Sequence, residues 1–427
     1  MIDRISRNPR DERKLLFCID RIEHSSYPVT ETGYGLLYRA WLRAQSDGTQ
    51  IFVTYPGAAW HESEQGGLHI EAHQVLSFTD APYTFYRCQR DDYRPGDDVG
   101  SRRCHSEADA SLLHVNAVAG VVWRQETGEP GQMHAMLQAL ERVERDTVVY
   151  LSPRLALDPR FGSKIIPHSF DARLTPRTYH TNAAAELSVH DKAQRTAAFV
   201  RSTLGEPDTV IAKPLFGNNG VGIHVLGRDP VSGNQVSRTD DLDTWIELIT
   251  RYGDLVVQEY IPSVRSPLGN SAEALSAVPR DRHDFGEVRF LLIDGEIPRA
   301  ADGQPCLVAR RVPSANSLIA DSGISYASTL SHAEIAFLER LGPVYRRMGI
   351  YFGGGDLIRT PDPARPFVFT DAARSVCGHA VVTGALNGSP YLIIDQILDS
   401  LERHIAQNIK SPPISDTRPT QQDYLAS

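Results

Sequence analysis

Residues 211–222 read IAKPLFGNNGVG, and this stretch carries the strongest signal in the chain. A short apolar run reaches a lysine, and glycines with two asparagines between them follow it. Glycines permit positive φ and let backbone amides approach a phosphate, and the lysine adds a positive charge. The stretch therefore predicts a phosphate-binding loop between two strands, with a plain glycine-rich hairpin turn as the alternative. The predicted contacts are Lys213, Gly217, Asn218, Asn219 and Gly220.

The order of residues in this loop excludes two common nucleotide motifs. A Walker loop places its lysine after the glycines, whereas Lys213 precedes them. A dinucleotide fingerprint runs into a helix, whereas residues 222–226 (GIHVL) predict a second strand. A different nucleotide-binding architecture is therefore expected.

Four later segments extend the pattern. They are VVQEYIP at 256–262, GEVRFLLIDGE at 286–296, ARRV at 309–312, and GDLI at 355–358 before a strand that ends in Thr370-Asp371. This order of motifs resembles the ATP-grasp superfamily, and within it the bacterial glutathione synthetases and RimK-like ligases. The resemblance runs from about Lys14 to Ile405. It implies ATP and Mg²⁺ as cofactors and a reaction that joins a carboxylate to an amine.

The resemblance also implies an α/β chain with the ATP-grasp fold, in which two α+β lobes clamp ATP after an N-terminal parallel α/β pre-ATP-grasp domain. Alternating strand and helix patterns over roughly the first 150 residues indicate a parallel α/β layer by themselves. Residues 60–115 predict hairpins and loops. The expected divisions are 1–152 for the N-terminal domain, 153–254 for the small lobe, 255–410 for the C-terminal lobe with the metal site, and 411–427 for a disordered tail.

The resemblance places the nucleotide between the lobes. Lys164 and Lys213 match two lysines that bind phosphates in the family. By the same resemblance, the strand Val256–Tyr260 would line the adenine pocket, where the backbone at 259–261 would read the base edge between apolar walls. From the residues alone, VVQEY is a plain buried strand and Lys164 is a surface lysine. The implied adenine contacts are Gln258, Glu259, Tyr260 and Ile261.

Two aspartates, Asp356 and Asp371, match the positions that hold Mg²⁺ in the family. Mg²⁺ bound to ATP takes hard oxygen ligands, typically one or two carboxylates with phosphates and water. The second acid of the family begins an E-x-N motif, but residues 371–373 read DAA, so Ala373 replaces the asparagine. Three alternatives follow: a second metal held by another group such as Ser375, weaker metal binding, or a member without catalytic activity.

Arginines complete the implied site. Arg311, or its neighbour Arg310, matches an arginine that stabilises the transferred phosphoryl group, and Arg289 would contact substrate or phosphate. Because bidentate geometry suits arginine, the match of Arg124 to a position that binds a substrate carboxylate is chemically reasonable.

Two further substrate contacts are expected. Arg374 replaces a family hydrophobe and would add specificity. Asn316 keeps the residue type of the acceptor loop, although the arginine that the family has in this loop is absent.

Composition limits the partners of this chain. Its 427 residues include 44 Lys and Arg against 53 Asp and Glu, a net charge of −9. A chain this acidic is a poor general binder of nucleic acid or anionic membranes, and it has no apolar stretch long enough to span a bilayer. Five scattered cysteines disfavour a disulfide framework or a zinc site. The first 14 residues show no signal peptide, so we expect a cytoplasmic protein.

These features predict an ATP-dependent ligase that forms an amide or peptide bond through an acyl phosphate. Its expected substrates are amino acids or a γ-glutamyl dipeptide in a biosynthetic pathway. A RimK-like ligase that extends a peptide or protein is one alternative, and an ATP-binding module that has lost catalysis is another. The resemblance further implies a homo-oligomer, a dimer or a tetramer.

Overall fold

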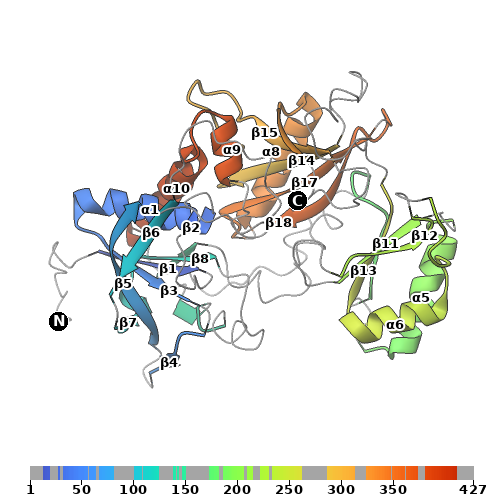
Figure 1. Ribbon diagram of the computed structural model, residues 1–427, viewed down its shortest axis with the longest axis horizontal. Coiled ribbons are helices and arrows are strands. Elements are labelled where there is room, and N and C mark those ends of the chain that lie inside the picture. The colour runs from blue at the N-terminus through green and yellow to red at the C-terminus, as the bar shows by residue number, and fades with distance from the viewer. Residues whose placement is uncertain are drawn as a thin grey trace.

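The computed structural model of the chain contains three β-sheets and the helices that cover them (Figure 1). The structure describes residues 13–19, 27–28, 32–55, 57–63, 67–80, 101–107, 109–124, 138–140, 142–143, 147–150, 173–181, 186–205, 209–214, 222–229, 233–261, 286–312, 324–347, 349–360, 362–373 and 380–410. Among these residues, no helix is long and apolar enough to cross a membrane.

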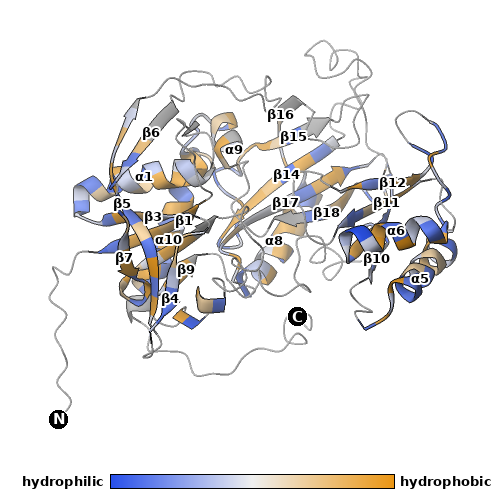
Figure 2. Cartoon of the chain, turned by 60° about the horizontal axis from the view of Figure 1, so that its bottom comes forward, coloured by the Kyte–Doolittle hydropathy of each residue, from blue (hydrophilic) through white to orange (hydrophobic). Residues whose placement is uncertain are grey.

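The first sheet has a parallel centre. Its central strands run in the order β3 (Gln50–Thr54), β1 (Lys14–Ile19), β8 (Gly120–Arg124) and β9 (Val148–Tyr150), and each neighbouring pair is parallel. Helix α1 (Thr32–Asp47) packs on this centre. The apolar residues of β1 and β3, which Figure 2 colours by their hydropathy, are buried. The parallel layer that the sequence predicts is therefore present in these strands.

Antiparallel strands extend the first sheet beyond β3. The long strand β5 pairs with β3, three of the shorter strands pair with β5, and β2 pairs with β6. The strands between residues 60 and 115 agree with the hairpins that the sequence predicts there. The antiparallel strands are β2 (Tyr27–Pro28), β4 (Trp60–Glu62), β5 (Leu68–Asp80), β6 (Ser101–Ser106) and β7 (Ser111–His114), and the 3₁₀ turn η1 (Val115–Ala117) follows β7.

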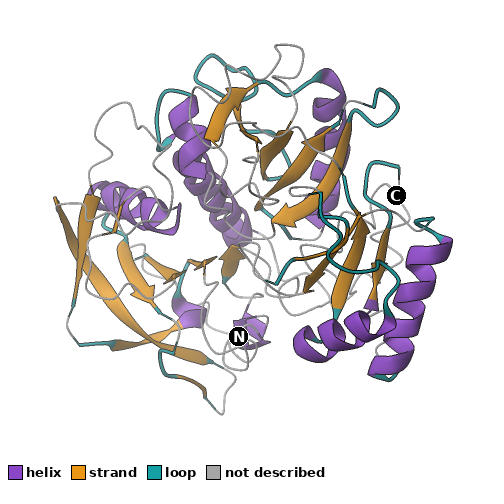
Figure 3. Cartoon of the chain, turned by 45° about the vertical axis from the view of Figure 1, so that its right-hand side comes forward, coloured by secondary structure: helices purple, strands orange, loops and turns teal. Residues whose placement is uncertain are grey.

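The second sheet is antiparallel, and the helices of the described residues cover one of its faces. Its order is β10 (Thr178–His180), β13 (Leu255–Glu259), β11 (Thr209–Pro214) and β12 (His224–Gly227). Helices α5 (Val189–Ser202) and α6 (Leu242–Tyr252) cover the face that lies away from the third sheet (Figure 1 and Figure 3). Ser188 caps α5 and Asp241 caps α6, because each side chain accepts a backbone N–H of the first turn.

The third sheet is also antiparallel. Its order is β16 (Ile324–Ser328), β15 (Val308–Val312), β14 (Gly286–Ile293), β17 (Phe352–Arg359) and β18 (Phe367–Ala373). Helix α8 (His332–Arg347) packs against it so closely that a Cβ on Gly342 would lie 1.8 Å from the carbonyl oxygen of Gly295. The turn after β14 and the middle of α8 therefore both require glycine.

The C-terminal helices return to the first sheet. The apolar side of α10 (Leu392–Lys410) shares one buried core with β1, β3 and β8, and α9 (Ala380–Leu386) joins it. Residues from β14 and β17, such as Leu291 and Phe352, lie in the same core. The helix that ends the predicted 255–410 unit thus packs against the sheet of the predicted 1–152 unit.

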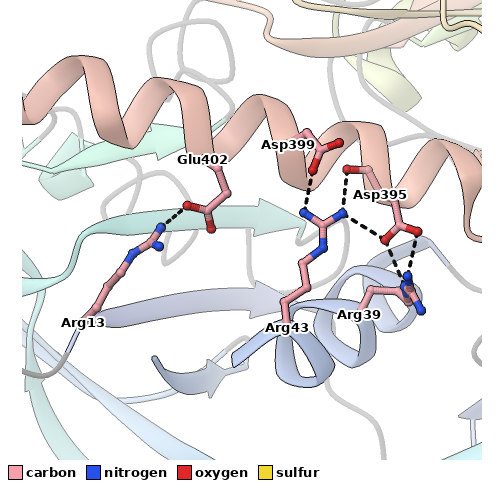
Figure 4. A network of polar contacts seen from close by, with 6 residues as sticks. All are labelled: Arg13, Arg39, Arg43, Asp395, Asp399 and Glu402. Carbon is pink, nitrogen blue, oxygen red and sulfur yellow. Dashed lines mark hydrogen bonds and ion pairs between the residues drawn. The ribbon is translucent and has the colours of Figure 1, made fainter. Parts of the chain in front are cut away.

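Ion pairs reinforce the contact of α10 with α1 (Figure 4). Arg39 binds both carboxylate oxygens of Asp395, at 2.9 and 2.8 Å. Arg43 reaches Asp395 at 3.1 Å and Asp399 at 2.7 Å, and Arg13 pairs with Glu402. Each of these half-exposed ion pairs adds little to the free energy of unfolding, so their main effect is to set the orientation of α10.

Asp294 fastens the turn after β14 to the last helix. Its φ of 52° is in the left-handed region, and its carboxylate accepts hydrogen bonds from Ser400, Arg403 and His404 at 2.7 to 2.8 Å. Burial alone would raise the pKa of Asp294, but these hydrogen bonds outweigh it and lower the pKa from 3.8 to about 2. The ionised carboxylate therefore stabilises the folded state.

We expect Asp294→Asn to destabilise the protein by about 2 kcal/mol at neutral pH, because a fall of about two pKa units on folding corresponds to about 2.7 kcal/mol and solvent screening reduces this value for a half-buried carboxyl. Asparagine tolerates the left-handed conformation, so the backbone of the turn is kept. The contribution is present above the unfolded pKa and disappears as the pH falls through the folded one.

Urea unfolding of both proteins between neutral pH and pH 2 measures this effect. The difference in unfolding free energy should narrow between pH 3.8 and about 2, the two pKa values of Asp294. A difference that does not depend on pH would contradict the assignment.

Candidate functional site

The third sheet carries charged side chains on the face away from α8. Along β14, Val288, Phe290 and Leu292 are buried against α8, and Glu287 and Arg289 point to the opposite face because side chains alternate along a strand. In register, Arg289 lies opposite Asp356, Asp356 lies opposite Asp371, and Glu287 lies opposite Arg311. Three predicted site residues, Arg289, Asp356 and Asp371, therefore share one face, and Arg311 lies at the register position opposite Glu287.

Arg289 links two carboxylates on this face. Its Nε lies 3.1 Å from Glu287 Oε1 and 3.1 Å from Asp356 Oδ1. All three side chains are mostly buried, with exposed fractions of 23% for Arg289 and 18% for each acid. The guanidinium thus compensates part of the negative charge that would otherwise collect at Asp356. Glu287 is a site residue that sequence reasoning missed, although its place two residues before Arg289 was a usable signal.

A β-bulge in β18 turns Asp371 toward Asp356. Phe369 pairs with Leu357 and faces the core, so regular alternation would place residue 371 on the core face as well. The register shifts between Asp356 and Leu357, and Thr370 is the extra residue. Asp371 is thereby placed opposite Asp356 on the charged face, and the Thr370 hydroxyl donates to the Asp356 carbonyl at 3.2 Å. Bulges commonly redirect a side chain next to a functional site.

The pair Asp356 and Asp371 suits a hard cation carried by a nucleotide. The described residues contain no group of three or more His, Cys, Asp or Glu side chains that could hold a metal by themselves. Two carboxylates are enough for Mg²⁺ when phosphates and water supply the other ligands. The two aspartates lie within the adjacent strands β17 and β18, and β18 continues to Ala373 instead of ending at Asp371 as the sequence suggested. Ala373, opposite Gly354, offers no side-chain oxygen, so the donor set of the family is reduced here.

The second sheet turns a polar face away from its helices. Val210 and Ala212 of β11 pack on the helices, so Lys213 projects to the other face. In register, Val256 lies between Lys213 and His180, and Gln258 donates to the Thr178 hydroxyl at 3.3 Å. Burial lowers the pKa of His180 to about 4, so its imidazole is neutral at physiological pH. No motif signalled this histidine, because its place depends on strand pairing.

Glu259 binds two arginines at the end of β13. Its carboxylate accepts from Arg177 Nε at 2.7 Å and from Arg365 Nη1 at 3.0 Å. Burial alone would raise the pKa of Glu259, but the hydrogen bonds from Arg177 and Arg365 outweigh it and lower the pKa. The Glu259 side chain thus connects the segment before β10 to the connection between β17 and β18. Tyr260 and Ile261 follow Glu259 in the chain.

The other predicted contacts have less structural description. Arg124 is the last residue of β8, and Arg311 lies in β15. Seven predicted residues lie outside the described part of the chain: Lys164, Gly217, Asn218, Asn219, Gly220, Asn316 and Arg374. Their roles stay predictions.

Comparisons with known proteins agree with this architecture. The chain is 26% identical over 227 residues to a glutathione synthetase of Agrobacterium fabrum, covering 51% of this chain and 54% of that protein. It is 28% identical over 180 residues to a glutathione synthetase of Prochlorococcus marinus, covering 42% and 46%. The chain therefore matches about half the length of these curated relatives. No family model matches it.

Among solved structures, the chain is similar to the ATP-grasp ligase PsnB complexed with a phosphomimetic variant of its minimal precursor, Mg and ADP. The TM-score is 0.50 at 14% identity, and the match covers 91% of this chain and 98% of that one. Together, the comparisons confirm the predicted ATP-grasp fold and the similarity to glutathione synthetases.

We expect Gly355→Ala to destabilise the third sheet and displace Asp371. A Cβ at this position would lie 2.5 Å from the Asp371 carbonyl oxygen and 2.7 Å from the ring of Phe290. Overpacking of this kind typically costs about 1–3 kcal/mol. Urea unfolding measures the loss, and a variant with the stability of the natural protein would contradict the tight packing at the bulge.

Proposed function

We propose that this chain, which has the ATP-grasp fold, is an ATP-dependent ligase that joins a carboxylate to an amine through an acyl phosphate. The observation that carries this proposal is the row Arg289, Asp356 and Asp371 on one sheet, together with Lys213 on the helix-free face of another. Such a set supplies positive charge for phosphates and carboxylates for their cation.

In the proposed reaction, an oxygen of the substrate carboxylate attacks the γ-phosphorus of ATP. The bond from that phosphorus to the β–γ bridging oxygen breaks, and ADP leaves. The amine nitrogen of the second substrate then attacks the acyl carbon, phosphate leaves, and the amine loses a proton. No step needs a covalent bond to the protein, so positioning and electrostatic stabilisation carry the catalysis.

The residues divide this work by charge. Lys213 and Lys164 bind the phosphates of ATP. Arg289 and Arg311 stabilise the negative charge on the phosphoryl group in the transition state of its transfer. Asp356 and Asp371 hold Mg²⁺, which neutralises phosphate charge when it is bound. When Asp356 binds the cation, Glu287 remains as a partner for Arg289.

The similarity to glutathione synthetases supports amino-acid or γ-glutamyl dipeptide substrates. Arg124, Asn316 and Arg374 are the proposed substrate contacts, with Arg124 binding a carboxylate in bidentate fashion. A ligase that extends a peptide is the second candidate, and it would form product only when a peptide is supplied.

A trapping experiment tests the chemistry before the amine is known. Purified protein, Mg-ATP, hydroxylamine and a pool of amino acids and γ-glutamyl dipeptides should give a hydroxamate, because hydroxylamine attacks an acyl phosphate. ADP should form in equal amount, and mass spectrometry identifies the carboxylate. Nucleotide binding without any hydroxamate or ADP would contradict the ligase proposal and favour a binding module.

Single substitutions test the site assignment. We expect Lys213→Met and Asp356→Asn each to lower hydroxamate formation by about 100-fold or more, the usual loss when one charge-stabilising group is removed. Lys192→Met is the matched control, because Lys192 pairs with Asp254 at 2.9 Å and belongs to α5, on the opposite face of the same sheet. Full activity of the Lys213 or Asp356 variant would remove that residue from the site.

A further inference from the structure

A buried carboxylate joins three segments where the second and third sheets meet. Glu259 has a side-chain exposure of only 8% and is the last residue of β13. It accepts from Arg177, just before β10, at 2.7 Å, and from Arg365, in the connection between β17 and β18, at 3.0 Å. We name these three residues the Glu259 junction.

Backbone hydrogen bonds run through the same place. The Arg177 N–H donates to Glu259 Oε1 at 3.1 Å, and the Glu259 N–H donates to the Arg177 carbonyl at 3.0 Å. The second guanidinium nitrogen of Arg365 donates to the Thr175 carbonyl at 3.0 Å, and the Phe369 N–H donates to the Leu174 carbonyl at 2.6 Å. The chain on either side of the junction is therefore held in one geometry.

The hydrogen bonds from Arg177 and Arg365 keep the Glu259 carboxylate from contacting a nucleotide directly. Charge-assisted hydrogen bonds are stronger than neutral ones, and removing one partner of a buried pair leaves an uncompensated charge. To reach a nucleotide, the carboxylate would have to leave two guanidinium groups. The next two residues, Tyr260 and Ile261, have no charged side chain.

We propose that Glu259 is a positioning residue, which sets base recognition by holding the backbone at Tyr260 and Ile261 through Arg177 and Arg365. The proposal rests on the proposed function, in which that backbone reads the edge of adenine. Hydrogen bonds to a base edge depend on placement within about half an ångström, so a loosened junction weakens them first. The contacts of Lys213 with phosphate lie elsewhere on the sheet and do not distinguish one base from another.

The test compares two nucleotide analogues by calorimetry in Mg²⁺ buffer. The non-hydrolysable analogues of ATP and GTP (AMPPNP and GMPPNP) are titrated into the natural protein, Glu259→Gln and Arg365→Met. We expect the affinity for AMPPNP to fall by about ten-fold in each variant, with a much smaller change for GMPPNP. The preference for adenine over guanine should therefore fall, which a general loss of stability would not cause.

Glu334→Gln is the matched control. Glu334 is 1% exposed and also binds an arginine, Arg359, through two hydrogen bonds of 2.7 Å, but it lies at the start of α8. We expect this variant to lose thermal stability as Glu259→Gln does and to keep the natural preference for adenine.

Three outcomes are distinguishable. A reduced preference in Glu259→Gln and Arg365→Met, with a natural preference in Glu334→Gln, supports the proposal. Equal preferences in all folded variants overturn it and leave the ligase proposal standing. Absence of nucleotide binding by the natural protein overturns the proposed function and the role of Glu259 with it.

Discussion

The candidate site depends on the alternation of side chains across the third sheet. One face of β14 and β17 must bury Phe290 and Leu357 against α8, so the other face is left for charged residues. Asp371 would fall on the wrong face without the extra residue Thr370 in β18. The bulge therefore brings two aspartates together, and Gly355 leaves the space in which the strands approach.

Two fixed contacts hold the sheets that carry the site. Helix α10 packs in the core of the first sheet, and Asp294 ties it to the turn after β14. At the other end, the Glu259 junction ties the second sheet to the third. Both contacts centre on a buried or half-buried carboxylate with several donors, so charge pairing orients elements that apolar packing brings together.

Much of the site was predictable from local patterns. In the sequence, Lys213 precedes a glycine-rich stretch and Asp356 follows three glycines, so each lies in a recognisable local motif. His180, Arg177 and Arg365 lie in no such motif. Each gains its place from a strand partner or an ion pair that is distant in sequence, and no short pattern encodes those partners.

The sequence by itself determined the classes of element and the chemistry available. Apolar runs predict the strands, the resemblance carried by the order of motifs predicts the ATP-grasp fold, and with a net charge of −9 the proposed phosphate site needs a local cluster of positive charge. Only the tertiary structure decided which charges meet. Three long-range features did this: the strand register, the one-residue bulge in β18 and the packing of α10 against the first sheet. No local segment encodes them, because the energy of strand pairing and packing is shared among residues that are distant in sequence.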